Sequence, residues 1–294
     1  MRFLFIVNPI AGRGEGKKKW EQIKVVVEEL KLDYEVVFTG EPGESVFLAE
    51  EGVAKGFDVL VAVGGDGTVN EVVRGIIEAG AKGDVKLGIV PAGTGNDLVR
   101  TLDIPFNIKE AVHVLKNGHV KNIDLGKVNG DYFLNVVGIG FDAAVAEEIN
   151  NNIRWLKGTA AYLYGIFKMI FQYKSPEMVI KIDDRELEGR FFLVAIANAK
   201  YYGGGMMIAP DADPADGLFD ICVIKDVSQM EVLKVLPALF KGNHVKHPAV
   251  KVYRGRKVFV KSKKRVLVQA DGELKGTVPM SFEIEAKTFP VLVP

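Results

Sequence analysis

A glycine-rich segment with one carboxylate, residues 64–68 (Gly-Gly-Asp-Gly-Thr), directly follows an apolar run at residues 58–63. The apolar run predicts a buried strand, and the helical spacing of apolar residues from Val69 onward predicts that a helix begins at once. Such a turn brings backbone N–H groups and a helix N-terminus close to a phosphate. Phosphate binding needs no negative side chain, so Asp66 indicates a bound metal ion or a proton to be moved.

Two further glycine-containing loops follow predicted strands. The first loop, residues 8–12 (Asn-Pro-Ile-Ala-Gly), comes after a strand expected at residues 2–8. The third loop, residues 91–97 (Pro-Ala-Gly-Thr-Gly-Asn-Asp), comes after a strand expected at residues 87–90, and residues 64–68 form the second loop. Because parallel strands end at the same edge of a sheet, we expect the three loops to converge on one ligand.

The order of predicted elements divides the chain in two. Strands and helices alternate up to residue 121, which predicts a Rossmann-like nucleotide-binding α/β domain over residues 1–121. Short strands with hairpin signals, such as Asn129-Gly130, then predict a mainly antiparallel β-sandwich domain over residues 122–294. The last few residues are expected to return to the first domain.

The composition excludes several classes of protein. Lys plus Arg and Asp plus Glu are both 38 in 294 residues, so no overall field favours nucleic acid as a partner. The single cysteine, Cys222, suits a reducing cytoplasm. Residues 2–8 predict a strand rather than a signal peptide, and the apolar span at residues 159–173 is too short to cross a bilayer. We therefore expect a cytoplasmic protein.

The three loops resemble the diacylglycerol kinase catalytic family, which includes bacterial soluble lipid kinases and sphingosine kinases. The resemblance continues at residues 216–220 (Asp-Gly-Leu-Phe-Asp) and 269–273 (Gln-Ala-Asp-Gly-Glu), so it covers nearly the whole chain in order. NAD kinases share the Gly-Gly-Asp-Gly segment, but the two later motifs favour the lipid kinases. The chain has no P-loop signature.

The resemblance implies ATP as co-substrate and Mg²⁺ as cofactor. It places the nucleotide on residues of the three loops and on two neighbours, Thr39 and Asn70: Asn8, Pro9, Gly12, Thr39, Gly64, Gly65, Asp66, Gly67, Thr68, Asn70, Thr94 and Asn96. It also implies a structural Mg²⁺ held by Asp213, Asp216 and Leu218, the first and last through backbone carbonyls. From the residues alone, this acidic stretch is equally well explained as a solvated loop.

The resemblance assigns the general base to Glu273, in the motif that also contains Asp271. A carboxylate within hydrogen-bond reach can accept the proton of an attacking hydroxyl. From the residues alone, Asp271-Gly272 is an ordinary hairpin turn. Asp66 is the rival base, and it can instead hold Mg²⁺ on the nucleotide. The expected catalytic set is therefore Glu273, Asp66 and Asp271.

Residues 155–171 are densely apolar and aromatic, with Arg154, Lys157 and Lys168 among them. Such a helix can lie on a membrane surface, line an acyl-chain groove or be buried in the core. The glycine-rich stretch at residues 201–207 either borders the acceptor site or only connects two strands. We expect peripheral contact with the inner face of the membrane.

These observations predict an ATP-dependent lipid kinase of phospholipid biosynthesis that transfers the γ-phosphate to a hydroxyl of diacylglycerol or a related lipid. One alternative is an NAD kinase-like enzyme. The other is a non-catalytic regulator that binds nucleotide or lipid on a kinase fold. The sequence leaves open which lipid is the partner and whether the chain forms a homodimer.

Overall fold

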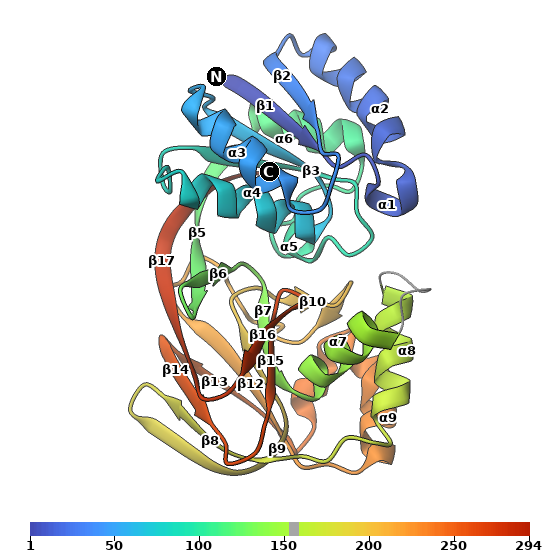
Figure 1. Ribbon diagram of the computed structural model, residues 1–294, viewed down its shortest axis with the longest axis vertical. Coiled ribbons are helices and arrows are strands. Elements are labelled where there is room, and N and C mark those ends of the chain that lie inside the picture. The colour runs from blue at the N-terminus through green and yellow to red at the C-terminus, as the bar shows by residue number, and fades with distance from the viewer. Residues whose placement is uncertain (153–158) are drawn as a thin grey trace. The chain divides into compact units, whose positions relative to one another are not determined.

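The chain folds into two units, and the computed structural model describes residues 1–152 and 159–294 (Figure 1). The first unit contains Met1–Ile123 and Lys287–Pro294, and the second contains Asp124–Ala286. The chain passes between the units within β5 (His119–Val128) and again within β17 (Met280–Val293).

The first unit is built on a parallel sheet with the strand order β4-β3-β1-β2. The end of β17 adds a further parallel strand, with Val291 opposite Leu87 of β4. Strand β3 is buried along its whole length, which explains its uninterrupted apolar sequence. The strand bounds are β1 (Arg2–Val7), β2 (Asp33–Phe38), β3 (Val59–Gly64) and β4 (Lys86–Pro91).

Helices cover this sheet in two packed pairs. Helices α3 (Glu44–Ala54) and α4 (Asp66–Glu78) pack against each other, and Figure 1 shows both on the viewer's side of the sheet. Helix α2 (Gly16–Glu29) packs against α6 (Ile108–Asn117). Two short helices are α1 (Ala11–Gly14), which begins within the first loop, and α5 (Asp97–Thr101), which begins at the last residue of the third loop. The predicted α/β class is confirmed.

The second unit is a sandwich of two sheets whose described pairings are antiparallel. One sheet has the order β9-β8-β14-β17, and the other has the order β16-β15-β7-β9-β12-β13. Strands β5 and β6 (Asp131–Phe133) form the predicted hairpin at Asn129-Gly130. The other strands are β7 (Val136–Gly140), β8 (Glu177–Ile182), β9 (Arg185–Ala197), β10 (Tyr201–Tyr202), β11 (Met206–Met207), β12 (Phe219–Lys225), β13 (Val250–Gly255), β14 (Lys257–Lys261), β15 (Leu267–Ala270) and β16 (Glu273–Thr277).

Strand β9 belongs to both sheets of the sandwich. Its first half pairs with β8, and residues 193–197 pair with β7. A strand that passes from one sheet to the other makes a corner of the sandwich. Apolar side chains fill the space between the sheets, and the rings of Phe133 and Phe219 stack there with centroids 5.6 Å apart.

A second apolar cluster lies between the sandwich and its helices. It joins Phe141, Phe192 and Ile166 with other apolar side chains of the sheet and the helices. The helices are α7 (Phe141–Asn152), α8 (Thr159–Met169), α9 (Gln229–Leu239) and the 3₁₀ turn η1 (Asn243–Lys246), and Figure 1 shows α7, α8 and α9 gathered at one side of the second unit.

The sequence also predicts a glycine-rich loop over residues 12–16, one strand over residues 132–137, and two separate strands over residues 280–284 and 289–292. The loop prediction agrees with the left-handed φ angles of Gly12 and Arg13, 60° and 67°, which interrupt the short helix α1. The strand predictions are wrong in their bounds. The run at residues 132–137 divides into β6 and β7, because the N–H groups of residues 134–136 donate to the carboxylate of Asp271. The runs at residues 280–284 and 289–292 form the single strand β17, which stays extended through a polar stretch although Lys287 has a φ of 53°.

Candidate nucleotide and acceptor sites

The three loops of the first unit meet, as the edge rule predicted. The second and third loops touch through glycines, because a Cβ at Gly93 would overlap the Cα of Gly65. In the other direction, a Cβ at Gly65 would lie 3.1 Å from the Cα of Gly93. Only two glycines allow the backbones to come this close.

The first loop is tied to the other two by side chains. The Nδ2 of Asn8 donates to the hydroxyl of Thr68 at 3.2 Å, and its Oδ1 accepts from the N–H of Ile10 at 3.1 Å. The Nζ of Lys19 in α2 donates to the carbonyl of Ala92 at 3.1 Å. The sequence analysis did not identify Lys19, because its role depends on the fold rather than on spacing.

Asp66 has a structural role that its position in the motif did not reveal. Its carboxylate accepts hydrogen bonds from the N–H groups of Asp97 at 2.7 Å and Leu98 at 3.4 Å, at the start of α5. It therefore fixes the third loop against the second. Burial raises the pKa of Asp66, and these N–H bonds oppose the rise.

The strand order places this cluster of loops at the switch point of the sheet. The chain lays β2 on one side of β1 and β3 on the other, so the loops after β1 and β3 lie where the order reverses. Open α/β sheets bind ligands at such switch points. Helix α4 begins there, and its first internal bond runs from Val69 N to Gly65 O at 3.1 Å. The first-turn N–H groups that precede Val69, such as that of Gly67, have no partner within the helix and can bind an anion.

The other predicted nucleotide residues lie around these loops. Thr94 is exposed, Thr39 is buried with its N–H bonded to Val7 O at 3.0 Å, and Asn96 is buried with its Nδ2 bonded to Gly93 O at 3.0 Å. Pro9 and Asn70 are half-buried. All of these residues belong to the first unit.

In the second unit, Asp271-Gly272 forms the predicted hairpin turn between β15 and β16. Both residues have positive φ, 48° and 89°, as a type I′ turn requires. The carboxylate of Asp271 accepts N–H bonds from Leu134 at 2.7 Å, Asn135 at 3.0 Å and Val136 at 3.0 Å. Asp271 therefore anchors the turn to the strand that leads into β7.

Glu273 begins β16 and is 74% exposed as a side chain. Its carboxylate lies 3.1 Å from the Nζ of Lys275, which in turn lies 3.0 Å from Asp131. The two hairpins that carry Asp131 and Glu273 are thus linked by one lysine. The structure holds Glu273 at a rigid strand end and leaves its carboxylate accessible.

An apolar hollow in the second unit was not predicted as such. Its cavity volume is about 80 Å³. The pocket is lined by α8, α9, η1, the sheet and the glycine-rich stretch at residues 201–207, including Ile166, Val232, Leu236, Leu239, Phe192, Tyr202 and Asp142. We call it the apolar pocket.

The comparisons with known proteins agree with this architecture. The profile of the diacylglycerol kinase catalytic domain matches residues 2–128, and that of the YegS C-terminal NAD kinase beta sandwich-like domain matches residues 135–293. A diacylglycerol kinase of Staphylococcus epidermidis is 31% identical over 281 residues, which cover 96% of this chain and 88% of that protein. The chain belongs to the diacylglycerol kinase family.

Further relatives within the family extend over the same length. A diacylglycerol kinase of Staphylococcus saprophyticus is 30% identical over 281 residues, covering 96% of this chain and 92% of that protein. The crystal structure of a candidate diacylglycerol kinase from Bacillus anthracis superposes with a TM-score of 0.84 at 26% identity. That comparison covers 100% of this chain and 95% of the other.

At the Mg²⁺ site that the family resemblance implies, the carboxylates of Asp213 and Asp216 are bonded to other groups of the protein. One oxygen of Asp216 accepts from the N–H of Leu218 at 3.0 Å, and the other pairs with the guanidinium of Arg254. The carboxylate of Asp213 accepts from the N–H of Ala215 at 3.1 Å. A cation at this site would have to displace Arg254, so these residues do not fit Mg²⁺ as they stand.

Two features are absent from the described part of this family member. Over residues 1–152 and 159–294, no group of three or more His, Cys, Asp or Glu side chains is placed to hold a metal ion. The predicted Mg²⁺ ligands Asp213, Asp216 and Leu218 are not a group of this type, because two of them would bind through backbone carbonyls. Within the same ranges, no helix is both long and apolar enough to span a bilayer.

Asp142, at the wall of the apolar pocket, is a polar residue that the sequence analysis missed. It is fully buried at the start of α7, and burial raises its pKa to about 7. The Nε2 of Gln269 donates to its Oδ2 at 3.0 Å. Tyr173 lies nearby; burial raises the pKa of its hydroxyl, and the charge of Asp142 raises it further.

The buried Asp142 should make stability depend on pH. Between about pH 4 and pH 7 the unfolded chain has released this proton and the folded protein retains it, so the free energy of unfolding falls as pH rises. Asp142→Asn removes the titration. The free energy of unfolding of the variant minus that of wild type should therefore rise by about 1.4 kcal/mol per pH unit across this window and level off above it. Urea unfolding at several pH values measures it, and a constant difference would contradict it.

Proposed function

We propose that this protein is an ATP-dependent lipid kinase that phosphorylates a hydroxyl of diacylglycerol or a related lipid. The observation that carries the proposal is the convergence of three glycine loops at the switch point of the first unit, in a chain of the diacylglycerol kinase family. Phosphoryl transfer depends chiefly on positioning and on charge stabilisation of the phosphates. A cradle of backbone N–H groups supplies both.

ATP enters as its Mg²⁺ complex, and the loops bind its phosphates. The second loop offers the first-turn N–H groups of α4, with Gly67 leaving room for a phosphate oxygen. Asn8 and Asp66 act as positioning residues, because they hold the first and third loops against the second. Mg²⁺ belongs to the substrate in this proposal, and no step depends on a protein-bound metal.

Glu273 is the proposed general base. The acceptor oxygen attacks the γ-phosphorus, the bond from that phosphorus to the β–γ bridging oxygen breaks, and ADP leaves with the electron pair. The hydroxyl proton passes to the Glu273 carboxylate. Asp66 is less suited to this task, because its carboxylate is half-buried and already accepts backbone N–H bonds from Asp97 and Leu98. Asp271 serves by anchoring the turn that carries Glu273.

The apolar pocket is the proposed site for the hydrocarbon part of the acceptor. Its walls are mostly apolar, with Asp142, Glu231, Tyr202 and two histidines as the charged or titratable exceptions. A lipid chain buried there leaves water, and each buried methylene contributes about 0.8 kcal/mol. The pocket also distinguishes this proposal from an NAD kinase, whose acceptor is polar.

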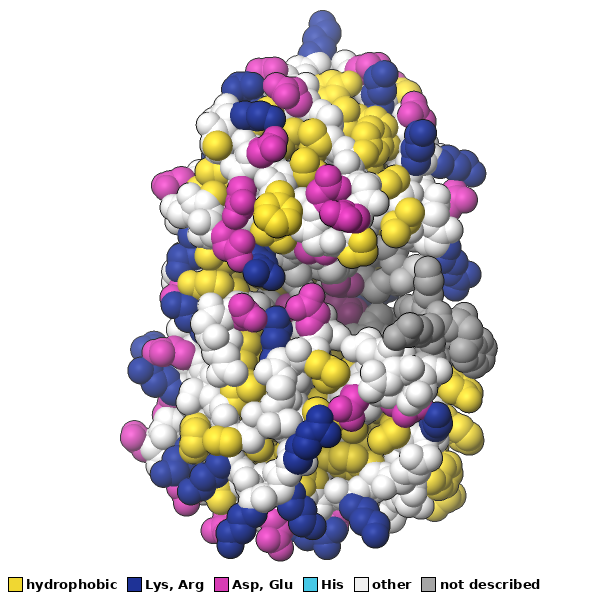
Figure 2. Space-filling model, viewed as in Figure 1, with side chains coloured by type: hydrophobic (Ala, Val, Ile, Leu, Met, Phe, Trp, Pro, Cys, Tyr) yellow, Lys and Arg dark blue, Asp and Glu magenta, His cyan; other side chains and the backbone are white. Residues whose placement is uncertain are grey.

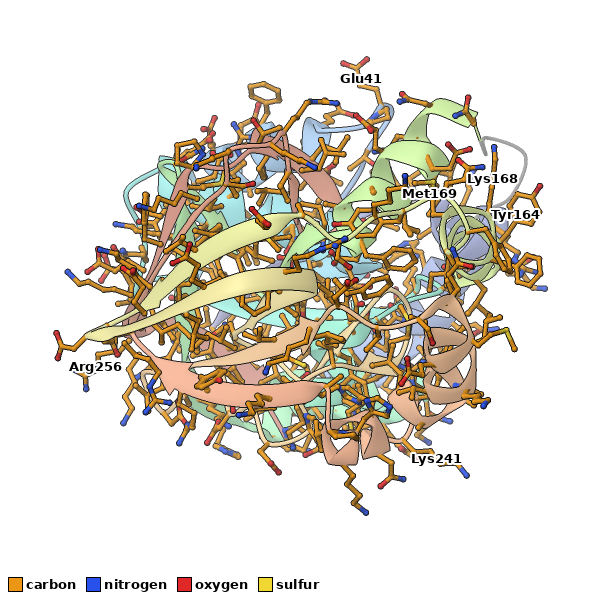
Figure 3. The ribbon with its side chains drawn as sticks, turned by 90° about the horizontal axis from the view of Figure 1, so that it is seen from below. Glu41, Tyr164, Lys168, Met169, Lys241 and Arg256 are labelled. Carbon is orange, nitrogen blue, oxygen red and sulfur yellow. The ribbon has the colours of Figure 1, made fainter. Side chains whose placement is uncertain are left out.

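Peripheral membrane contact through α8 and α9 belongs to the same proposal. Figure 2 shows hydrophobic side chains at the edge of the second unit where Figure 1 places these helices, and the exposed ones include Phe167, Phe171 and Met230. Figure 3 labels Tyr164 and Lys168 on the outer side of α8 and Lys241 just after α9. Lys168 is paired with Glu148 of α7, so Lys241 supplies the exposed basic charge. Exposed apolar and basic groups together suit an anionic lipid surface. The predictions for Arg154, Trp155, Leu156 and Lys157 concern residues outside the described ranges.

Phe167→Ser should weaken binding to vesicles of anionic phospholipid and diacylglycerol by about tenfold, since burial of a phenylalanine side chain contributes about 1.5–3 kcal/mol. Phe167 is 60% exposed. Phe47→Ser is the matched control, because Phe47 is 67% exposed on α3 of the first unit. Co-sedimentation compares the two variants. Equal losses for both, or none for Phe167→Ser, would remove α8 from the membrane contact.

One assay decides the function. The purified chain is incubated with Mg²⁺, labelled ATP and either diacylglycerol vesicles, other hydroxyl-bearing lipids or NAD, and the products are resolved by mass. The proposal expects a phosphorylated lipid. Phosphorylated NAD without a lipid product would favour the NAD kinase alternative, and ATP binding without transfer to any acceptor would favour a regulator.

A further inference from the structure

Gln269 of β15 bridges the apolar pocket and the turn that carries Glu273. Its side chain is buried, at 3% exposure. The Nε2 donates to Oδ2 of Asp142 at 3.0 Å, and the Oε1 accepts from the N–H of Gly272 at 2.7 Å. The Gln269 amide therefore donates to the wall of the apolar pocket and accepts from the hairpin turn.

The strand opposite Gln269 is shaped to permit this bridge. Gly138 of β7 pairs with Gln269 across the sheet. A Cβ at Gly138 would coincide with the carboxylate of Asp142. The carboxylate therefore occupies the space that a side chain at position 138 would fill. The placement of Asp142 beside Gln269 thus depends on a glycine in a buried strand, where glycine otherwise weakens a sheet.

The turn is held from two directions. Asp271 fixes it to residues 134–136 through three N–H bonds, and Gln269 fixes the next peptide, at Gly272. Because Gly272 directly precedes Glu273, the Gln269 bond restrains the peptide that sets the direction of the Glu273 side chain. The Glu273 carboxylate itself accepts from the Nζ of Lys275 at 3.1 Å, and this flexible side chain restrains it less.

We propose that Gln269 is a positioning residue for phosphoryl transfer, holding the Gly272 peptide and so the proposed base Glu273, with Asp142 fixing the amide in turn. The inference rests on the proposed function for its kinetic part. In this proposal, a lipid that enters the apolar pocket and moves Asp142 also moves the turn that carries Glu273, through the side chain of Gln269. A small displacement of a catalytic group can cost about 100-fold in rate.

The test uses hydrogen exchange at Gly272 together with steady-state kinetics on the full chain. Gln269→Leu should speed exchange of the Gly272 amide by about tenfold and lower kcat by about tenfold, with KM for ATP within about twofold of wild type. Asp142→Asn retains an acceptor for Nε2, so Gly272 should keep its slow exchange in that variant. Gln22→Leu, at an exposed position on α2, is the control and should change neither readout.

Gln269→Leu alone leaves a buried carboxyl without its amide and can fail to fold. The double variant Asp142→Leu with Gln269→Leu removes both buried polar groups, and it should show the same fast exchange at Gly272. The proposal is overturned if either folded variant shows both wild-type exchange of the Gly272 amide and wild-type kcat. It is also overturned if kcat falls while exchange at Gly272 stays as slow as in wild type. If wild type phosphorylates no lipid, the proposed function fails, and the exchange data still decide whether Gln269 holds the turn.

Discussion

Glu273→Gln should lower kcat for lipid phosphorylation by about 1000-fold and leave KM for ATP within about twofold of wild type. Glutamine keeps the size and hydrogen-bonding capacity of the side chain, but it cannot accept the hydroxyl proton. Since Glu273 is exposed and paired only loosely with Lys275, stability should barely change. Steady-state kinetics with vesicle-borne diacylglycerol, alongside thermal unfolding, measures both.

Glu186→Gln is the matched control for that variant. Glu186 also follows a hairpin turn in the second unit, and its carboxylate lies 3.0 Å from the Nζ of Lys181. It should retain wild-type kcat. If Glu273→Gln also retains it and Asp66→Asn does not, Asp66 is the base. Our proposal instead expects Asp66→Asn to raise KM for ATP more than it lowers kcat, because the α5 contact weakens.

Gly93→Val should weaken ATP binding by about 100-fold, because it separates two loops that must converge on the phosphates. Any Cβ at position 93 overlaps the Cα of Gly65, and this neighbour is backbone that cannot rotate away. The overlap should also destabilise the first unit, by about 1–3 kcal/mol. Calorimetric titration with Mg²⁺–ATP and urea unfolding separate the two effects.

Gly67→Ala shows whether a side chain in the second loop disturbs the fold as such. No described atom lies within 4 Å of a Cβ at Gly67, so this variant should unfold like wild type. It should still bind ATP less well, because the new methyl group occupies the open face over the first turn of α4. Normal ATP affinity in Gly93→Val would show that the contact between the second and third loops is not needed for binding.

The first unit could be predicted well because its signals are local. Apolar runs, glycines and helical spacing define β1 to β4 and the helices between them, and the edge rule then brings the loops together. Spacing could not show what Asp66 does. A lone aspartate in a glycine loop suggests a metal ion, and its bonds to Asp97 and Leu98 exist only once two separate turns have met.

The acceptor side was predicted less well because its residues are joined only by the fold. Asp142 stands alone in an apolar stretch, and Gln269 was seen only as part of a motif. A buried acid amid apolar residues, with a glycine four positions earlier at Gly138, was the available signal. Its meaning depends on the pairing of β7 with β15, which no local pattern specifies.

The return of β17 to the first unit affects how the protein folds during synthesis. The strand that borders β4 comes from Lys287–Pro294, whereas the rest of that unit is complete at Ile123. At 5–20 residues per second, a ribosome takes roughly 8 to 30 s to translate the intervening chain. Throughout that interval the Leu87 edge of β4 is open to strands of other nascent chains.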